Sequence, residues 1–162
     1  MTQKEKELLL KDLCARLPHR VKVYNTTFKE PTIQTLYGKI SGDEFLMEET
    51  YTSVGVDGDD FGSFNKKHYT GYVDFIKPYL RPMSSMTEEE REEWADLFMK
   101  PICELEQYVD EKEAQDMAPV LFGKSHSISI DWLNAHHFDY RGLIEKGLAL
   151  EAPEGMYNLN EK

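Results

Sequence analysis

The sequence contains little cysteine, because only Cys14 and Cys103 occur among its 162 residues. Small secreted domains that disulfides stabilise carry more cysteines at shorter spacings, so we expect both thiols to be reduced and to pack as small core side chains. Apolar runs long enough to cross a bilayer are missing as well, since Leu8–Leu10 is far too short. The first residues also lack the apolar stretch of a secretory signal. These absences predict a cytoplasmic protein that makes no membrane contact.

Signatures of the common catalytic sites are missing too. The chain has no Gly-rich phosphate loop of the Walker or dinucleotide type. Ser84 and Ser85 precede a predicted helix without the strand and Gly-x-Ser-x-Gly elbow that would place a nucleophile, so a turn or a helix cap explains them better. The sequence therefore gives no support for an enzyme, and we expect no cofactor.

One Asp/Gly segment resembles part of a calcium site. Residues 57–62 (DGDDFG) begin like a calcium-binding loop, with Asp at its first and third positions and Gly at its sixth. Phe61 and His68 stand where that loop needs an oxygen ligand and a bidentate carboxylate. We therefore interpret the segment as a turn that joins two strands.

A second group of possible metal ligands lies further along the chain: His126, Asp131, His136, His137 and Asp139. Adjacent histidines on a helix point about 100° apart, whereas zinc-binding helices place theirs four residues apart. No cysteine lies nearby to complete a structural zinc site. We interpret the histidines as structural, with one imidazole bonded to a carbonyl or carboxylate and the other exposed, and we expect no metal.

Charge is unevenly distributed along the chain, whose formal net charge is −11. Residues 1–40 have eight Lys and Arg against four Asp and Glu, whereas the remainder has eleven against twenty-six. Acid is densest over 88–116, with twelve acidic and three basic residues. Because phosphate contacts supply most of the affinity for nucleic acid, a general nucleic-acid binder is not expected. The acidic surface fits either a role in solubility or a basic partner.

The hydrophobic pattern predicts an α+β fold, and the length predicts a single domain over 1–162. An N-terminal helix is expected within 1–19, capped by Thr2 and ended by Pro18. Alternating apolar residues over 20–80 predict a small antiparallel sheet or an SH3-like barrel. Its strands are expected near 21–24, 32–40, 44–48 and 69–76, with a loop over 53–65 and an extended linker over 77–82.

The C-terminal half is predicted to be helical over 87–146, with an irregular tail over 151–162. Thr87 and Glu90 have the spacing of a capping box, and Pro101 is expected to break or kink the helix that follows. Two short helices are expected over 128–137 and 140–145. Such a pair invites comparison with DNA-binding helix-turn-helix units, but the second helix has too few basic residues to hold a duplex.

Two long strings resemble a known group of sequences. They are residues 77–90 (KPYLRPMSSMTEEE) and residues 131–144 (DWLNAHHFDYRGLI), the latter continuing to 147–153 (GLALEAP). Together with the opening segment 6–23, they are similar to a family of short uncharacterised proteins from gut Bacteroides genomes, their mobile elements and phages. The resemblance implies a shared fold and genomic context, and it implies no activity.

The function predicted from the sequence is non-enzymatic binding to a protein partner, in an accessory role. Aromatic and arginine residues, which are frequent at interface centres, occur in the segments 78–85 and 136–141. The candidate interaction surface therefore consists of Tyr79, Arg81, His136, His137, Asp139, Tyr140 and Arg141.

The alternative is single-stranded nucleic-acid binding by the β region, where tyrosines occur among cations. The residues concerned are Tyr24, Tyr37, Tyr51, Tyr69, Tyr72 and Tyr79, beside Lys22, Lys39, Lys66, Lys67, Lys77 and Arg81. Strands also favour tyrosine for structural reasons. A metal hydrolase is the third class, and the incomplete ligand groups give it no support.

Overall fold

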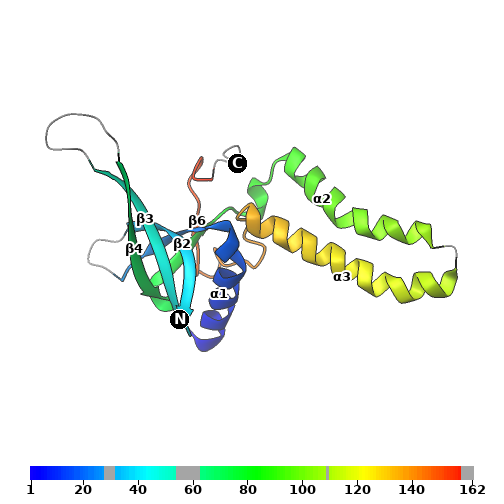
Figure 1. The fold of residues 1–162 in the computed structure, drawn as a ribbon, viewed down its shortest axis with the longest axis horizontal. Helices are drawn as coiled ribbons and strands as arrows, with labels where there is room; N and C mark the ends of the chain where they lie inside the picture. Colours follow the sequence, from blue (N-terminus) through cyan, green and yellow to red (C-terminus); the bar gives the residue numbers. More distant parts are fainter. Residues whose placement is uncertain (28–31, 54–62, 109, 158–162) are drawn as a thin grey trace. The chain divides into compact units, whose positions relative to one another are not determined.

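The computed structural model describes residues 1–27, 32–53, 63–108 and 110–157 (Figure 1). The length of the chain predicts one domain. In the structure, internal contacts group the residues into two compact units. The β unit comprises Met1–Leu80 and Arg141–Glu154, and the hairpin unit comprises Arg81–Tyr140 and Gly155–Lys162. The hairpin unit is thus inserted into the chain of the β unit. In the described part of the chain, no helix combines the length and apolar character needed to cross a bilayer.

Helix α1 (Gln3–Arg16) begins where the sequence predicts. The hydroxyl of Thr2 accepts a hydrogen bond from the backbone N–H of Glu5 (3.3 Å), and the Glu5 carboxylate accepts one from the backbone N–H of Thr2 (2.7 Å). This reciprocal capping box satisfies two donors that a helix start leaves without partners. The helix continues into a 3₁₀ turn (Leu17–His19) that contains Pro18.

The sheet of the β unit confirms the α+β prediction, but it is open and does not close into a barrel. Its strand order is β4-β3-β2-β1-β5-β6, and every pair is antiparallel except β5 with β6. The strands are β1 (Lys22–Asn25), β2 (Thr32–Ser41), β3 (Glu44–Ser53), β4 (Ser63–Tyr72), β5 (Ile76–Leu80) and β6 (Leu150–Glu151). The turn between β2 and β3 lies where the sequence places it, with Gly42 at φ 48°.

One face of this sheet forms the core of the β unit. Strand alternation buries Val23, Leu36 and Met47 on that face, and α1 lies beside the sheet in Figure 1 with Leu9 and Leu13 buried. Fully burying each such side chain contributes roughly 1.5–3 kcal/mol to stability. The apolar residues that define the strand and helix periods in the sequence therefore form the core of the β unit.

Two expectations for the β region are wrong. The segment expected to be a linker over 77–82 instead supplies β5 up to Leu80, and Pro78 stands opposite Val23 of β1. Proline is tolerated there because the described pairs of β6 begin only at Tyr79, so Pro78 has β1 as its one neighbour in the described sheet. The predicted loop over 53–65 is also too long, because β4 begins at Ser63 opposite Ser53.

The hairpin unit is built from two long helices that run side by side in opposite directions (Figure 1). Helix α2 (Glu88–Cys103) begins with the predicted capping box of Thr87 and Glu90. A 3₁₀ turn (Glu104–Gln107) follows, and helix α3 (Glu111–Ala135) begins after Asp110, whose carboxylate accepts from the N–H groups of two residues. The core of the hairpin unit consists of Met86, Trp132, Leu133 and Phe138, with Trp94, Leu97, Ile130 and Tyr140 packed against it. We call the end of the hairpin unit that contains this core its base.

Several helix boundaries differ from the prediction. Helix α2 continues through Pro101 and ends two residues later at Cys103, which is exposed and so is not the core residue expected; Cys14 is half-buried. Helix α3 begins at Glu111, well before the predicted 128, although Pro119 lies inside it. No helix forms over 140–145, because Gly142 adopts φ 64° and the chain turns.

A buried ion cluster fastens α1 to the returning segment of the β unit. The Asp12 carboxylate, which is 0% exposed, accepts from Nε and Nη2 of Arg16 at 2.7 and 3.2 Å. Nε of Arg141 lies 3.1 Å from Oδ1 of Asp12. The buried Asp12 carboxylate thus pairs with two guanidinium groups. It links α1, through Arg16, to the returning segment of the β unit, through Arg141.

We predict that Asp12→Ala lowers the free energy of unfolding by about 3–5 kcal/mol, because it removes a buried carboxylate that pairs with two guanidinium groups. Urea denaturation followed by circular dichroism measures the change. Glu7→Ala removes the same charge from an exposed position of α1 and should change stability by less than about 0.5 kcal/mol. Equal effects of the two variants would show that Asp12 is not an anchor.

Candidate functional site

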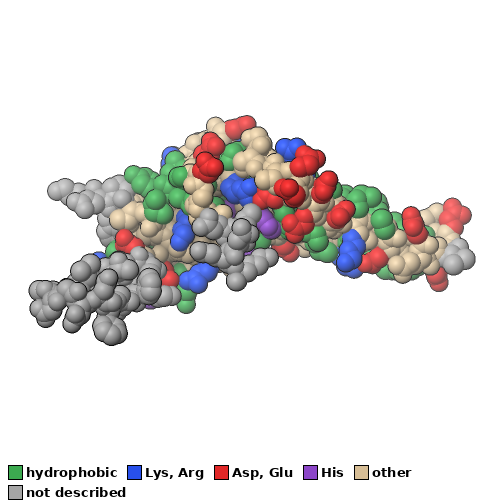
Figure 2. All heavy atoms as spheres, turned by 90° about the horizontal axis from the view of Figure 1, so that it is seen from above, with side chains coloured by type: hydrophobic (Ala, Val, Ile, Leu, Met, Phe, Trp, Pro, Cys, Tyr) green, Lys and Arg blue, Asp and Glu red, His purple; other side chains and the backbone are tan. Residues whose placement is uncertain are grey.

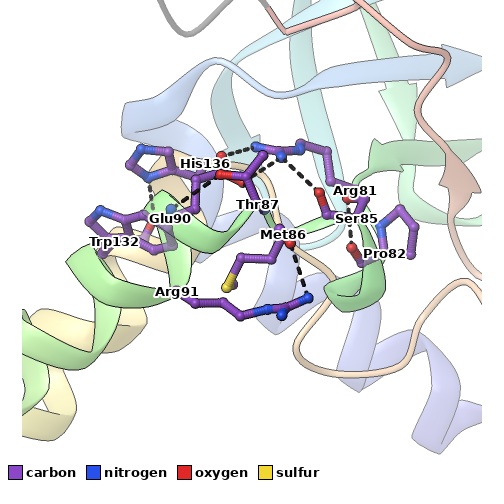
Figure 3. A network of polar contacts seen from close by, with 9 residues as sticks. All are labelled: Arg81, Pro82, Ser85, Met86, Thr87, Glu90, Arg91, Trp132 and His136. Atoms are coloured by element: carbon purple, nitrogen blue, oxygen red, sulfur yellow. Dashed lines mark hydrogen bonds and ion pairs between the residues drawn. The ribbon is translucent and has the colours of Figure 1, made fainter.

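Arg81, the first residue of the hairpin unit, is held from several directions (Figure 3). Its Nη1 and Nη2 donate to the two carboxylate oxygens of Glu90 at 2.7 and 2.9 Å, and its guanidinium lies 4.2 Å from the ring centroid of Phe138. Its backbone N–H donates to the carbonyl of His137, and its carbonyl accepts from the N–H of Asp139, both at 2.8 Å. We name this set the Arg81 clamp.

Glu90 has two roles in the clamp. Its carboxylate accepts hydrogen bonds from the Arg81 guanidinium. It also accepts a hydrogen bond from the backbone N–H of Thr87 at 2.9 Å, which completes the capping box of α2. Burial by itself would raise the pKa of Glu90, but the hydrogen bonds from Arg81 and Thr87 outweigh it, so the pKa lies below its ordinary value. Glu90 is therefore held in its ionised form.

The predicted surface residues that follow α3 also have partners inside the hairpin unit. The ring of His136 stacks on Trp132 with centroids 3.8 Å apart, and its Nδ1 lies 2.9 Å from the Trp132 carbonyl oxygen, as expected for one of the two histidines. His137 differs from the expectation of an exposed imidazole, because it is buried and stacks on Tyr157. Its φ of 61° ends the helix.

Tyr140 and Asp139 complete this group in the hairpin unit. The Tyr140 hydroxyl donates to Oδ1 of Asn134 at 3.1 Å, and Asp139 is buried. The structure thus brings together five of the seven residues of the predicted interaction surface, and it engages them in packing within their own unit.

Tyr79 and Arg141 belong to the β unit. Tyr79 meets Tyr24 edge-to-face at 6.5 Å, and burial raises its pKa. Arg141 contacts the buried Asp12 as described. These two side chains also take part in the internal structure of the unit that contains them.

Sequence reasoning did not find an apolar groove of the hairpin unit. A groove of about 350 Å³ lies between α2 and α3. Its lining is almost entirely apolar and comprises Trp94, Ala95, Phe98, Met99, His126, Ser129 and Ile130. We name it the hairpin groove. Met99 is 48% exposed, and Phe122, one turn before His126 on α3, is 50% exposed.

Acidic side chains border this groove. Glu88, Glu92 and Asp96 follow one another at four-residue spacing, so they form one row along α2, and all three are exposed. This row is adjacent to Ala95 and Met99, which lie three residues after Glu92 and Asp96. In Figure 2 the red acidic side chains gather over the helical hairpin beside green apolar ones. We name the three residues the acidic row.

The β unit presents a different surface on the side of the sheet opposite its core. Tyr24 stands between Ile33 and Lys77 in the strand register, and Lys22 pairs with Thr35. Arg20 lies 5.8 Å from the ring centroid of Tyr37. We name this surface the open sheet face: Arg20, Lys22, Tyr24, Ile33, Thr35, Tyr37, Glu48, His68, Lys77 and Tyr79.

The open sheet face gathers part of the predicted aromatic and basic set. Tyr24, Tyr37, Tyr79, Lys22 and Lys77 lie on it by strand alternation. Glu48, which is 6% exposed, lies beneath Arg20 and His68, with Oε1 3.2 Å from Arg20 Nη2 and Oε2 3.6 Å from His68 Nε2. Burial is the main cause that lowers the pKa of Lys22.

Other members of the set lie elsewhere. Tyr69 stands opposite Met47 on the core side of the sheet, and Arg81 belongs to the hairpin unit. Tyr51 and Lys66 have side chains outside the described part of the structure, as does the whole Asp/Gly segment 57–62. Among the described residues, no three His, Cys, Asp or Glu side chains come together as a metal site would require.

We predict that Glu90→Gln lowers the free energy of unfolding by about 2 kcal/mol at neutral pH, because it removes the anion from a charge-assisted pair. Glutamine still suits the capping box, so the change isolates the ion pair. The pKa of Glu90 is depressed in the folded state, so its contribution is complete above the ordinary pKa of glutamate and disappears as the pH falls through the folded pKa.

Denaturation of both proteins at a series of pH values measures this difference. The difference in the free energy of unfolding between wild type and Glu90→Gln should disappear in acid. Glu89→Gln, at an exposed position of the same turn, should differ little from wild type at any pH. A difference that stays constant with pH would mean that the ionised pair contributes nothing to stability.

Comparison with known proteins finds no match for this chain among protein-family models, curated proteins or solved structures. The resemblance to the family from Bacteroides genomes and phages therefore stays a prediction that rests on residues 6–23, 77–90, 131–144 and 147–153.

Proposed function

We propose that the chain is a non-enzymatic accessory protein that binds a protein partner through the hairpin groove. The observation that carries this proposal is the groove itself, which is apolar and is lined by half-exposed Met99. Half-exposed Phe122 lies one helical turn before the lining residue His126. Aromatic residues and methionine are enriched in protein interfaces, and a hydrophobic groove between helices is a common receptor for a partner. An origin in a phage or mobile element is part of the same proposal and rests on the sequence resemblance.

The groove is a better contact surface than the residues that the sequence singled out. Arg81, His136 and Tyr140 already contact groups of their own unit, so a partner would have to displace those contacts. Met99 and Phe122 remain half exposed, and covering them would remove apolar surface from water at about 25 cal/mol per Å². The residues of the predicted surface thus stabilise the base of the hairpin unit, and we propose the groove as the contact surface instead.

We expect the double variant Met99→Ser with Phe122→Ser to lose partner binding while it stays folded, because both side chains are about half exposed. Tagged wild type and variant are compared by affinity purification from cells of the source organism, with quantitative mass spectrometry. The matched control is Ile40→Ser with Tyr72→Ser, which removes equally exposed apolar groups from the β unit. A partner retained by the groove variant and lost by the control would overturn the proposal.

Single-stranded nucleic-acid binding is the second candidate, and the open sheet face is the observation that favours it. Tyrosines and cations alternate there across neighbouring strands, and bases stack on such rings while cations meet the phosphates. The β unit has thirteen Lys and Arg against fifteen Asp and Glu, so its net charge of −2 opposes a polyanion far less than the whole chain does.

If this second function is real, a fluorescent oligothymidine should bind the whole protein at low salt, and binding should weaken steadily as salt rises. Tyr37→Ala with Lys77→Ala should reduce the affinity by roughly tenfold or more, through lost stacking and one lost phosphate contact. Phe75→Ala with Lys11→Ala, which removes one exposed ring and one exposed cation outside this set, is the control in the same unit. Fluorescence anisotropy gives the affinities, and no binding at low salt would eliminate this function.

A further inference from the structure

The hairpin unit holds most of the net charge of the chain. It has six Lys and Arg against fifteen Asp and Glu, which gives −9 of the total −11. Three of these acids form ion pairs with basic side chains: Glu90 with Arg81, Glu88 with Arg91 and Glu104 with Lys124. The groove therefore lies within a strongly negative surface, which attracts cationic groups and repels anionic ones.

The shape of the groove suits a helix. Two antiparallel helices form its walls, and a third helix packs into such a groove with its side chains between theirs. The residues along the groove follow helical rows, with exposed Ala95 and Met99 on α2 and with exposed Phe122, exposed His126 and half-buried Ile130 in one row on α3. Helix α2 has 16 residues, so a partner helix of about 24 Å, or four turns, would run along the full length of α2.

Charge decides between the possible occupants. A second copy of this chain would bring a further acidic row, and its hairpin unit would bring a net charge of −9 against the −9 of the first. A helix with apolar residues at i, i+3, i+4 and i+7 and with Lys or Arg beside them would instead meet Met99 and Phe122 with its apolar face. Its cations would then face Glu88, Glu92 and Asp96.

We infer that the hairpin groove receives a basic amphipathic helix of a partner protein, which completes a three-helix bundle. The inference rests on the proposed function, since it specifies what the groove binds. The apolar residues of the groove supply the burial, and the acidic row selects the charge and fixes the direction from which the partner approaches.

The probe for this inference is a labelled 18-residue peptide with leucine at i, i+3, i+4 and i+7 and lysine at the other positions. Whole protein is titrated into it at physiological salt, and anisotropy gives the affinity while circular dichroism reports helix formation. The same peptide with glutamate in place of lysine is the charge control. We expect the lysine peptide to bind and to become helical, and the glutamate peptide to show no binding.

Variants separate a seated helix from loose attraction between opposite charges. Met99→Ser with Phe122→Ser should abolish binding. Neutralising the acidic row (Glu88→Gln, Glu92→Gln, Asp96→Asn) should weaken binding roughly tenfold through the loss of three favourable pairs. The matched control neutralises Glu106, Glu111 and Glu113, three exposed acids at the far end of the hairpin, and should leave the affinity within about twofold.

Each opposite result overturns the inference. Equal weakening by the two neutralised variants would mean non-specific charge attraction, and no binding of the lysine peptide would exclude a basic helix. A dimer in analytical ultracentrifugation that Met99→Ser with Phe122→Ser converts to a monomer would identify a second copy as the occupant. In these cases the proposed function still stands if the groove variant loses its partner in the affinity purification, so the two failures are distinguishable.

Discussion

The base of the hairpin unit depends on Arg81. This residue links the start of the inserted segment to its end through backbone hydrogen bonds to His137 and Asp139, and its guanidinium connects the same point to the first turn of α2 through Glu90. The face of Phe138 covers the charge from one side. Because Glu90 also caps α2, one ion pair fixes the direction in which the helix leaves the clamp, and with it the position of every groove residue on α2.

The sequence predicts the parts of this fold that local chemistry determines. Thr2 and Thr87 start helices because a short hydroxyl side chain meets the third N–H, and Gly42 marks the hairpin turn. The sequence predicts helical structure over 87–146, but it does not show that 111–127 continues into the helix expected at 128, because Leu121 and Ser125 are the only buried residues of that stretch and no apolar stripe marks it. Strand β5 was missed because a proline in a strand is tolerated only when the neighbouring strands allow it.

The candidate site was predicted less well, for a physical reason. Residue type alone indicates that Arg81, His136 and Tyr140 suit an interface, but it does not reveal whether their partners lie inside or outside the molecule. The groove needs two helices side by side, and residue type alone does not reveal which helices pack against each other. What the sequence does contain is the acid of 88–116, and the structure places a row of it beside the groove.

The inserted position of the hairpin unit also affects the order in which the chain folds. Strands β5 and β6 are adjacent in the sheet although about seventy residues separate them, so closing that loop from a fully open chain is slow and entropically unfavourable. If the helices form first, the bridge between Arg81 and Phe138 shortens the open loop to the roughly ten residues before Leu150. The shorter loop lowers the free-energy cost of closure, which is entropic, by about 2 kcal/mol. The clamp then acts as a folding nucleus that brings the two segments of the β unit within reach of each other.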